Sequence, residues 1–170
     1  MPNLVLTGFM GTGKTTVGKK VARELGMEFV DTDKEIEQVT GLAVSEIFYR
    51  YGEIRFRSEE QAAVRRLAQG DNRVIATGGG VVLNQENMTH LRANGVVVCL
   101  AASPEVIYER VRRKKTRPLL ATEDPKATIR ELLQEREQFY RVADVIVDTS
   151  GKNPEQVRDE VIAIFKSRTK

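Results

Sequence analysis

Five short apolar runs, separated by segments with helical periodicity, constrain the fold of this chain more than any other feature. The runs cover residues 3–7, 28–30, 73–77, 95–100 and 144–148. Runs that are nearly continuous in apolar residues are typical of strands buried on both faces of a parallel sheet. Parallel strands need long crossovers, which the intervening helical segments supply. We therefore predict an α/β fold, a three-layer α/β/α sandwich around a five-stranded parallel sheet.

The helices of this fold are expected between the strands, and one longer loop separates two of them. Glycines that follow periodic segments, as Gly26 and Gly41 do, are typical helix stops. A length of 170 residues suits a single domain, 1–170, with a substantial core. The predicted helices cover residues 14–25, 34–40, 43–51, 54–69, 87–93, 104–113, 126–142 and 154–167, and the loop covers 114–124.

The composition is that of an ordinary globular protein, with 41% hydrophobic and 30% charged residues. Lys and Arg exceed Asp and Glu by 27 to 24, and this net charge of +3 suits anionic ligands but does not indicate nucleic acid by itself. No signal peptide is recognisable, and no apolar stretch approaches the roughly 18 residues of a membrane span. We therefore expect a cytoplasmic protein, a monomer, with neither nucleic acid nor membrane as partner.

The single cysteine, Cys99, lies inside the fourth apolar run and excludes an intrachain disulfide. A thiol in the interior of a strand is expected to be buried and unreactive, although a lone cysteine can also serve as a nucleophile.

A phosphate-binding loop follows the first strand. Gly8, Gly13, Lys14 and Thr15 match the pattern G-x-x-x-x-G-K-[ST], and an amphipathic segment comes directly after them. In such a loop the glycines let backbone N–H groups point inward, the lysine reaches the β- and γ-phosphates, and the hydroxyl meets Mg²⁺. The alternative is a glycine-rich turn without a ligand. The residues expected to bind ATP here are Gly11, Thr12, Gly13, Lys14, Thr15 and Thr16.

Two further groups of residues follow the second and third strands and are expected at the same sheet edge. Asp31 and Asp33, if extended, point the same way about 6.5–7 Å apart, so one carboxylate can serve a metal and the other an acceptor hydroxyl. The alternative for Asp33 is a helix N-cap. The run Gly78-Gly79-Gly80 would let a ligand approach the backbone, or it is a plain flexible turn.

A basic run at 110–117 holds six cations in eight positions. It is a solvated face, a nucleic-acid patch or a mobile lid that carries a phosphate-binding arginine, and the sequence alone leaves these readings open.

Six segments occur in one order along the chain, and in this combination they resemble the shikimate kinases, small members of the nucleoside-monophosphate-kinase-like P-loop group. The resemblance covers nearly the whole chain. The segments are residues 8–15, Asp31-Thr32-Asp33, Phe56-Arg57-Ser58-Glu59-Glu60, Gly78-Gly79-Gly80, Arg117-Pro118-Leu119-Leu120, and Arg136 with Tyr140.

This resemblance implies transfer of the γ-phosphoryl group of ATP to the 3-hydroxyl of shikimate, with a shikimate-binding region at 34–60 and a lid at 112–124. Lys14, Asp33 and Arg117 would be catalytic, with Asp33 acting as a base or aligning the hydroxyl. Thr15 and Asp31 would serve Mg²⁺. The resemblance also implies a substrate site of Asp33, Arg57, Glu60, Gly78, Gly79, Gly80 and Arg136 with apolar walls Phe48 and Phe56, and an adenine site of Arg110, Asn153 and Pro154.

Within that assignment, Arg57 and Arg136 clamp the substrate carboxylate, and Glu60 orients Arg57. Both arginines lie in segments rich in Glu, so surface pairs at i,i+3 or i,i+4 are the alternative for each. Two other functions remain open from the residues alone: a small-molecule kinase of gluconate or nucleotide type, and a P-loop switch or nucleic-acid-binding ATPase that uses 110–117. A GTPase is disfavoured because Asn-Lys, the start of the guanine-reading motif, does not occur.

Overall fold

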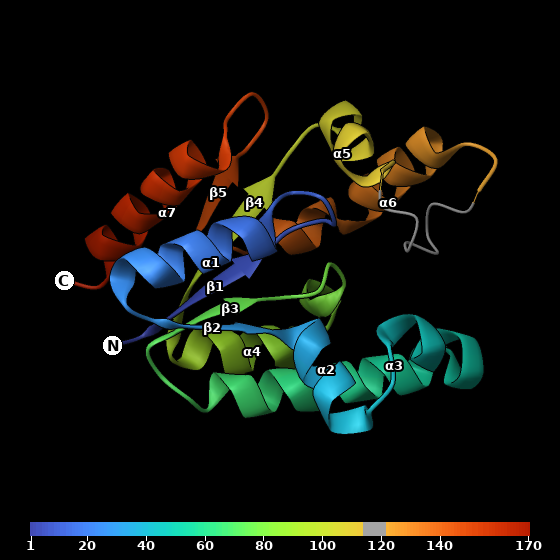
Figure 1. Cartoon of the computed structure of the whole chain (residues 1–170), viewed down its shortest axis with the longest axis horizontal. Coiled ribbons are helices and arrows are strands. Elements are labelled where there is room, and N and C mark those ends of the chain that lie inside the picture. The colour runs from blue at the N-terminus through green and yellow to red at the C-terminus, as the bar shows by residue number, and fades with distance from the viewer. Residues whose placement is uncertain (114–121) are drawn as a thin grey trace.

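The computed structural model describes residues 1–113 and 122–170, and in this part of the chain five strands form one parallel sheet (Figure 1). The sheet has the order β2-β3-β1-β4-β5, so β1 lies at its centre and pairs with β3 on one side and β4 on the other. This confirms the predicted sheet. The strands are β1 (Asn3–Thr7), β2 (Glu28–Asp31), β3 (Arg73–Ala76), β4 (Gly95–Ala101) and β5 (Val145–Asp148).

Helices cover both faces of the sheet and complete the predicted three layers. They are α1 (Lys14–Leu25), α2 (Thr32–Thr40), α3 (Val44–Ala68), α4 (Gln85–Ala93), α5 (Pro104–Val111), α6 (Pro125–Tyr140) and α7 (Pro154–Arg168), with a short 3₁₀ helix η1 (Val81–Leu83). In Figure 1, α1 and α7 lie side by side over the sheet, while α2 and the first part of α3 extend beyond the carboxyl end of β2.

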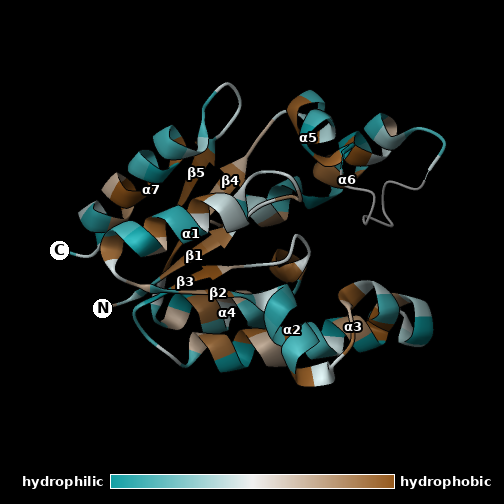
Figure 2. Ribbon diagram, in the orientation of Figure 1, coloured by the Kyte–Doolittle hydropathy of each residue, from teal (hydrophilic) through white to brown (hydrophobic). Residues whose placement is uncertain are grey.

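The core follows the alternation of side chains along the strands. Leu4 and Leu6 of β1 point to one face and pack in a cluster with side chains of α1 and α7. Val5 points to the other face, into a cluster that holds residues of α3, α4, α5 and α6. Apolar colour accordingly runs along the strands, and polar colour lies on the outer sides of the helices (Figure 2). A strand buried on both faces explains why its sequence is nearly continuous in apolar residues.

The helix ends follow local chemistry. Gly26 and Gly41 end α1 and α2 in the left-handed conformation, at φ +66° and +71°, as the sequence predicted. Ser103 caps α5, and its hydroxyl accepts a hydrogen bond from the backbone N–H of Val106. Glycines thus end two of these helices, and a polar side chain begins the third.

Three differences from the prediction have a clear local cause, and other ends of elements shift by one or two residues. The two helices expected at 43–51 and 54–69 are the arms of α3, which is broken at Gly52, with φ +85° and ψ 177°. Helix α4 begins two residues earlier than expected because Asn84 caps it. The 3₁₀ helix η1 was not predicted, since three apolar residues carry no helical period.

Most of the predicted lid at 112–124 falls on residues 114–121, which lie outside the described residues. Arg117 is one of them. Within residues 1–113 and 122–170, no helix combines the length and the apolarity that a membrane crossing requires.

Candidate active site

The carboxyl ends of β1, β2 and β3 bring the predicted site residues to one edge of the sheet. The chain switches there from one side of β1 to the other, which is where ligands bind in open parallel sheets. A cavity of about 300 Å³ opens at this edge. It is lined by Met10, Gly11, Gly13, Lys14, Thr15, Thr16, Asp31, Asp33, Thr77, Gly78, Gly79, Arg110 and Val111.

The phosphate loop has the backbone that an anion site needs. Gly8, Gly11 and Gly13 have φ values of +137°, +78° and +99°, a region that favours glycine. No side chain caps α1, so the N–H groups of its first turn are available to an anion. The Lys14 ammonium donates to the carbonyls of Gly8 (2.6 Å) and Phe9 (2.9 Å), which holds it over the loop.

The two aspartates lie together but differ from the predicted geometry. Helix α2 begins at Thr32, so Asp31 is its N-cap and accepts from the backbone N–H groups of Asp33 (2.8 Å) and Lys34 (3.2 Å). Asp33 is in the first helical turn, so the expectation of an extended pair and the alternative of Asp33 as the N-cap are both wrong. The sequence could not show which aspartate starts the helix.

A hydroxyl and a carboxylate meet at the metal position that the sequence predicted. Thr15 Oγ1 donates to Asp31 Oδ2 at 3.3 Å. Such oxygens suit Mg²⁺, which in nucleotide sites takes one or two protein oxygens and completes its shell with phosphate and water. No group of three His, Cys, Asp or Glu that could hold an ion occurs in the described parts of the chain. The oxygens present therefore fit a metal brought in by a nucleotide.

A buried charged cluster lies beside Asp33. Glu60 is 2% exposed, and its carboxylate accepts from Arg57 Nη1 at 2.9 Å. Burial raises the pKa of Glu60, and the charge of Asp33 raises it further. The positive charges of Arg57 and Arg136 oppose this increase. Arg136 is 9% exposed and places its guanidinium 5.7 Å from the centre of the Phe9 ring. The alternative of surface ion pairs therefore fails for Arg136. For Arg57 both readings hold in part, because it pairs with the buried Glu60 and, at 3.6 Å, with the exposed Glu53.

The three glycines make room for this cluster. A Cβ on Gly78 would lie 2.9 Å from Asp33 Oδ1 and 3.3 Å from Glu60 Oε2, and one on Gly80 would overlap the Arg57 guanidinium. One on Gly79 would lie 3.4 Å from Arg136 Nη1. The sequence led us to expect that a ligand approaches this backbone closely. In the structure, charged side chains of the protein do so, which argues against a plain flexible turn.

Two residues fix the glycine turn, and sequence reasoning gave neither of them a role. The buried Thr32 hydroxyl accepts from the backbone N–H of Gly78 at 2.9 Å. The Tyr140 hydroxyl donates to the carbonyl of Gly79 at 2.8 Å. Burial raises the pKa of Tyr140 to about 12, so its hydroxyl keeps the proton that it donates. Both residues belong to the segments that carry the family resemblance, and this is the one sequence signal that could have drawn attention to them.

Phe48 and Phe56 lie on the two arms of α3 and pack together, with ring centres 4.4 Å apart. Phe56 belongs to a small core cluster with Ile36, Ile47 and Ala63, whereas Phe48 is 37% exposed. Neither residue lines the cavity at the phosphate loop, so their role as walls of a substrate pocket stays a prediction.

The predicted adenine residues lie on helix α5 and at the start of helix α7, and Arg110 lines the same cavity as the phosphate loop. Arg110 donates to the carbonyls of Gly11 (3.1 Å) and Thr149 (3.2 Å) and to the Thr149 hydroxyl (3.0 Å). It thus joins α5 to the phosphate loop and to the end of β5. Asn153 forms a capping box with Gln156 and Pro154 is the first residue of α7. The start of α7 explains both residues structurally, so their contact with adenine stays a prediction.

Comparisons with known proteins converge on one family. The family model described as shikimate kinase matches residues 10–166. The shikimate kinase of Caldanaerobacter subterraneus subsp. tengcongensis is 57% identical over 165 residues, which cover 97% of this chain and 96% of that protein. A solved structure of shikimate kinase from Acinetobacter baumannii in complex with shikimate has a TM-score of 0.94 at 38% identity, covering 99% of this chain and 95% of that one. A gluconokinase from Sinorhizobium meliloti, at 18% identity and a TM-score of 0.60, covers 98% of this chain and 93% of that one, and shares the fold alone.

Proposed function

Because the chain belongs to the shikimate kinase family, we propose that it transfers the γ-phosphoryl group of ATP to the 3-hydroxyl of shikimate, giving ADP and shikimate 3-phosphate. Family membership makes it an ATP-dependent kinase that acts on shikimate in aromatic biosynthesis. One observation carries the assignment of the acceptor site: Asp33, Glu60, Arg57 and Arg136 surround the Gly78–Gly80 turn at the mouth of the phosphate loop.

The donor side consists of the phosphate loop and the start of α1. The first-turn N–H groups and Lys14 would hold the phosphates, and Lys14 would exchange the carbonyls of Gly8 and Phe9 for phosphate oxygens. Thr15 and Asp31 would hold Mg²⁺, which supplies charge neutralisation at the transferring group when bound. Arg110 would fix the nucleotide side of the loop through its bonds to Gly11 and Thr149.

The acceptor side is built for a hydroxylated carboxylate. Arg57 and Arg136 offer planar guanidinium groups, which pair bidentately with a carboxylate. Glu60 holds Arg57 in place from the buried side. Asp33 lies between this cluster and the phosphate loop, lining the cavity, so it is placed to accept the hydroxyl proton or to align the hydroxyl for attack.

Phosphoryl transfer depends mainly on positioning and charge neutralisation, because the transition state needs little covalent help from the protein. Lys14 and the start of α1 supply part of that charge. Arg117 is proposed as a further contributor on the family resemblance. We also propose that the enzyme acts as a monomer, since every group assigned above belongs to one chain, and that it acts in the cytoplasm, as the sequence led us to expect.

The test is a coupled assay of ADP release with Mg·ATP and shikimate, beside parallel reactions with gluconate, a nucleoside monophosphate and no acceptor. We expect rapid ADP release with shikimate only. Phosphorus NMR of the product, with its coupling to the ring proton at carbon 3, checks which hydroxyl carries the phosphate. ADP release that does not depend on shikimate would refute the proposal, and phosphate on another hydroxyl would refute its regiochemistry alone.

A further inference from the structure

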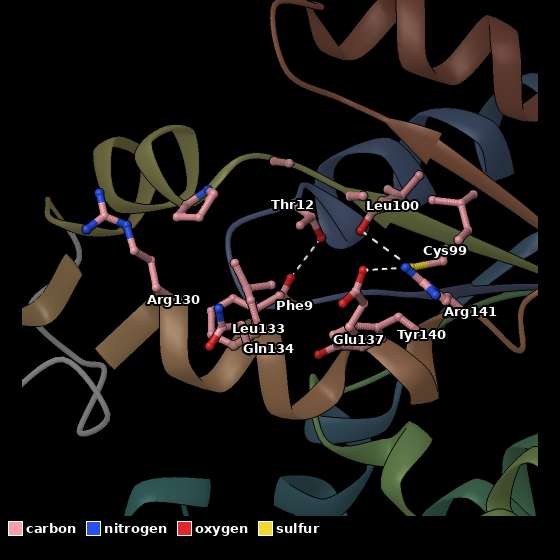
Figure 3. Close-up of a pocket in the computed structure, with 14 residues that line it drawn as sticks. Phe9, Thr12, Cys99, Leu100, Arg130, Leu133, Gln134, Glu137, Tyr140 and Arg141 are labelled. Carbon is pink, nitrogen blue, oxygen red and sulfur yellow. Dashed lines mark hydrogen bonds and ion pairs between the residues drawn. The ribbon is translucent and has the colours of Figure 1, made fainter. Parts of the chain in front are cut away.

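A second cavity, of about 520 Å³, lies behind the phosphate loop between β4 and helix α6 (Figure 3). It shares no lining residue with the cavity of the candidate active site, although the same loop borders both. Phe9 and Thr12 face the second cavity, while Met10, Gly11 and Gly13 line the first. The phosphate loop thus separates the two cavities.

The interior of the second cavity is apolar. Cys99 of β4 lies on one side and Leu133 of α6 on the other (Figure 3), whereas the side chain of Leu100, which also borders the cavity, packs on the opposite face of the sheet. Burial raises the pKa of the Cys99 thiol, so this sulfur is neutral and belongs to the apolar lining. The cavity continues to Ile146 on the edge strand β5, which is 48% exposed. A cavity of this size and lining is typical of sites for small organic molecules.

Two aromatic side chains border this cavity but keep their rings in the core. Phe9 is 1% exposed and Tyr140 is 8% exposed, and both pack in the cluster on this face of the sheet. An occupant therefore meets mainly the aliphatic part of the lining.

Two exposed arginines lie on the rim of the cavity, and each is paired with a glutamate. Arg130 and Arg141 line it together with a single carboxylate, that of Glu137. Arg141 pairs with Glu137 at 2.7 Å, and Arg130 pairs with Glu105 at 3.1 Å, but all four side chains are more than half exposed. Exposed pairs of this kind contribute little and exchange readily for another anion. The guanidinium groups therefore suit the planar carboxylate of a ligand whose body lies inside.

We propose that this cavity is a binding site for a small apolar carboxylate, and that the carboxylate is bound together with ATP and shikimate rather than in place of either. The site is defined by the separate cavity, its apolar lining and its two exposed arginines. No residue lines both cavities, although Thr12, which is expected to bind ATP, borders this one.

The experiment is isothermal titration calorimetry of the full chain, saturated with Mg·ADP and shikimate, with three probes that share one ring system. The probes are 2-naphthoate, 2-naphthylmethanol and 2-naphthylmethylammonium, which differ in charge. Saturation with shikimate keeps the carboxylate probe away from Arg57 and Arg136. We expect 2-naphthoate to bind with one site per chain, at least about fivefold more tightly than the alcohol, with the ammonium weakest.

Variants of α6 locate the bound probe. Gln134 is exposed and lines the cavity, whereas Gln138, one turn later, is exposed and does not line it. Gln134→Trp should fill the cavity and weaken 2-naphthoate at least about tenfold, and Gln138→Trp should leave it within twofold. Arg141→Gln should weaken the carboxylate but not the alcohol. Arg158→Gln, which removes an arginine paired with Asp159 on α7, is the matched control.

Four results would overturn the proposal: no binding of 2-naphthoate to the saturated enzyme, equal affinity for the alcohol, affinity that falls as ADP or shikimate is added, or equal weakening by Gln134→Trp and Gln138→Trp. Kinase activity of both tryptophan variants within twofold of the wild type confirms that they are folded. If Gln134→Trp is not folded, Arg141→Gln and its control decide the question.

Discussion

Among the described residues, Asp33 is the carboxylate that lines the phosphate loop cavity and also influences Glu60 in the arginine cluster. If it accepts or aligns the acceptor hydroxyl, Asp33→Asn should lower kcat by about 100-fold or more and leave ADP affinity nearly unchanged. Glu35→Gln is the matched control, because Glu35 is in the same first turn of α2 but pairs with Arg66 at 3.0 Å. Steady-state kinetics and calorimetry with ADP measure both quantities. An Asp33→Asn enzyme with near-normal kcat would reduce Asp33 to a structural residue.

Glu60 couples the stability of the protein to pH. Its pKa in the folded protein lies above its ordinary value of 4.5, chiefly because of burial. Between these two values the folded state holds more protons than the unfolded chain, so the contribution of Glu60 to stability falls as pH rises through its folded pKa. The free energy of unfolding of wild type minus that of Glu60→Gln should therefore fall as pH rises above 4.5. Urea unfolding across this range measures it, and a difference that rises with pH would contradict the assignment.

At the residue scale the sequence predicted which side chains meet but not how they are held. The loop pattern identified Lys14 and Thr15 because its spacing carries a mechanism. Thr32 and Tyr140 could not be assigned a role in this way, since each acts through one hydrogen bond to a turn whose path depends on the fold. The roles of Asp31 and Asp33 depend on where α2 begins, and the sequence offers both residues as acceptable N-caps.

Each glycine of the Gly78–Gly80 turn lies against different charged side chains of the site, so the turn can be tested one residue at a time. Gly78→Ala places a methyl group against Asp33 and Glu60 and should lower kcat more than it changes KM for shikimate. Gly80→Ala displaces the Arg57 guanidinium and should raise KM for shikimate at least about tenfold, with a smaller effect on kcat. Kinetics with shikimate as the varied substrate separate the two. The same pattern in both variants would mean that the turn moves as one unit.

Helix α5 is hydrogen-bonded to the phosphate loop through Arg110. Arg110→Gln loses the guanidinium bonds to Gly11 and Thr149, which tie the phosphate loop to β5, and should raise KM for ATP about tenfold while KM for shikimate stays within twofold. Arg112→Gln is the control, since Arg112 is paired with Glu109 at 3.1 Å on the outside of α5. Equal effects of the two substitutions on KM for ATP would show that the general charge of this region matters, rather than the geometry of Arg110.

Elements were predicted well where one period ran for several residues, and poorly at their joints. The two arms of α3 were separated correctly in the sequence because Gly52 interrupts the pattern, although the arms continue as one broken helix. The turn of η1 and the early start of α4 had no periodic signal. Propensity and pattern describe the interior of an element, whereas tertiary contacts decide its last residues.

The hydrophobic clusters of the described structure differ greatly in size, and this difference should determine which part of the protein unfolds locally first. Large clusters of buried side chains cover the two faces of the sheet. The cluster between α2 and α3 contains only Ile36, Ile47, Phe56 and Ala63 as buried residues. A region with few buried apolar contacts opens at a lower free energy than the global transition. The arm of α3 before Gly52 therefore belongs to the least stable part of the described structure.

Hydrogen exchange measured by mass spectrometry tests this organisation. Without ligand, amides of residues 44–51 should exchange at least about tenfold faster than those of β1 and β4. Shikimate should slow exchange in α2 and α3, because Asp33, Arg57 and Glu60 lie there, while Mg·ADP should slow exchange mainly in residues 8–15. Each ligand stabilises the part of the molecule that holds its partners, so protection by shikimate that spreads evenly over the sheet would contradict the division. Protection of residues 8–15 by shikimate alone would place the acceptor on the donor side of the loop, and the assignment of Asp33, Arg57 and Glu60 to the acceptor would then be wrong.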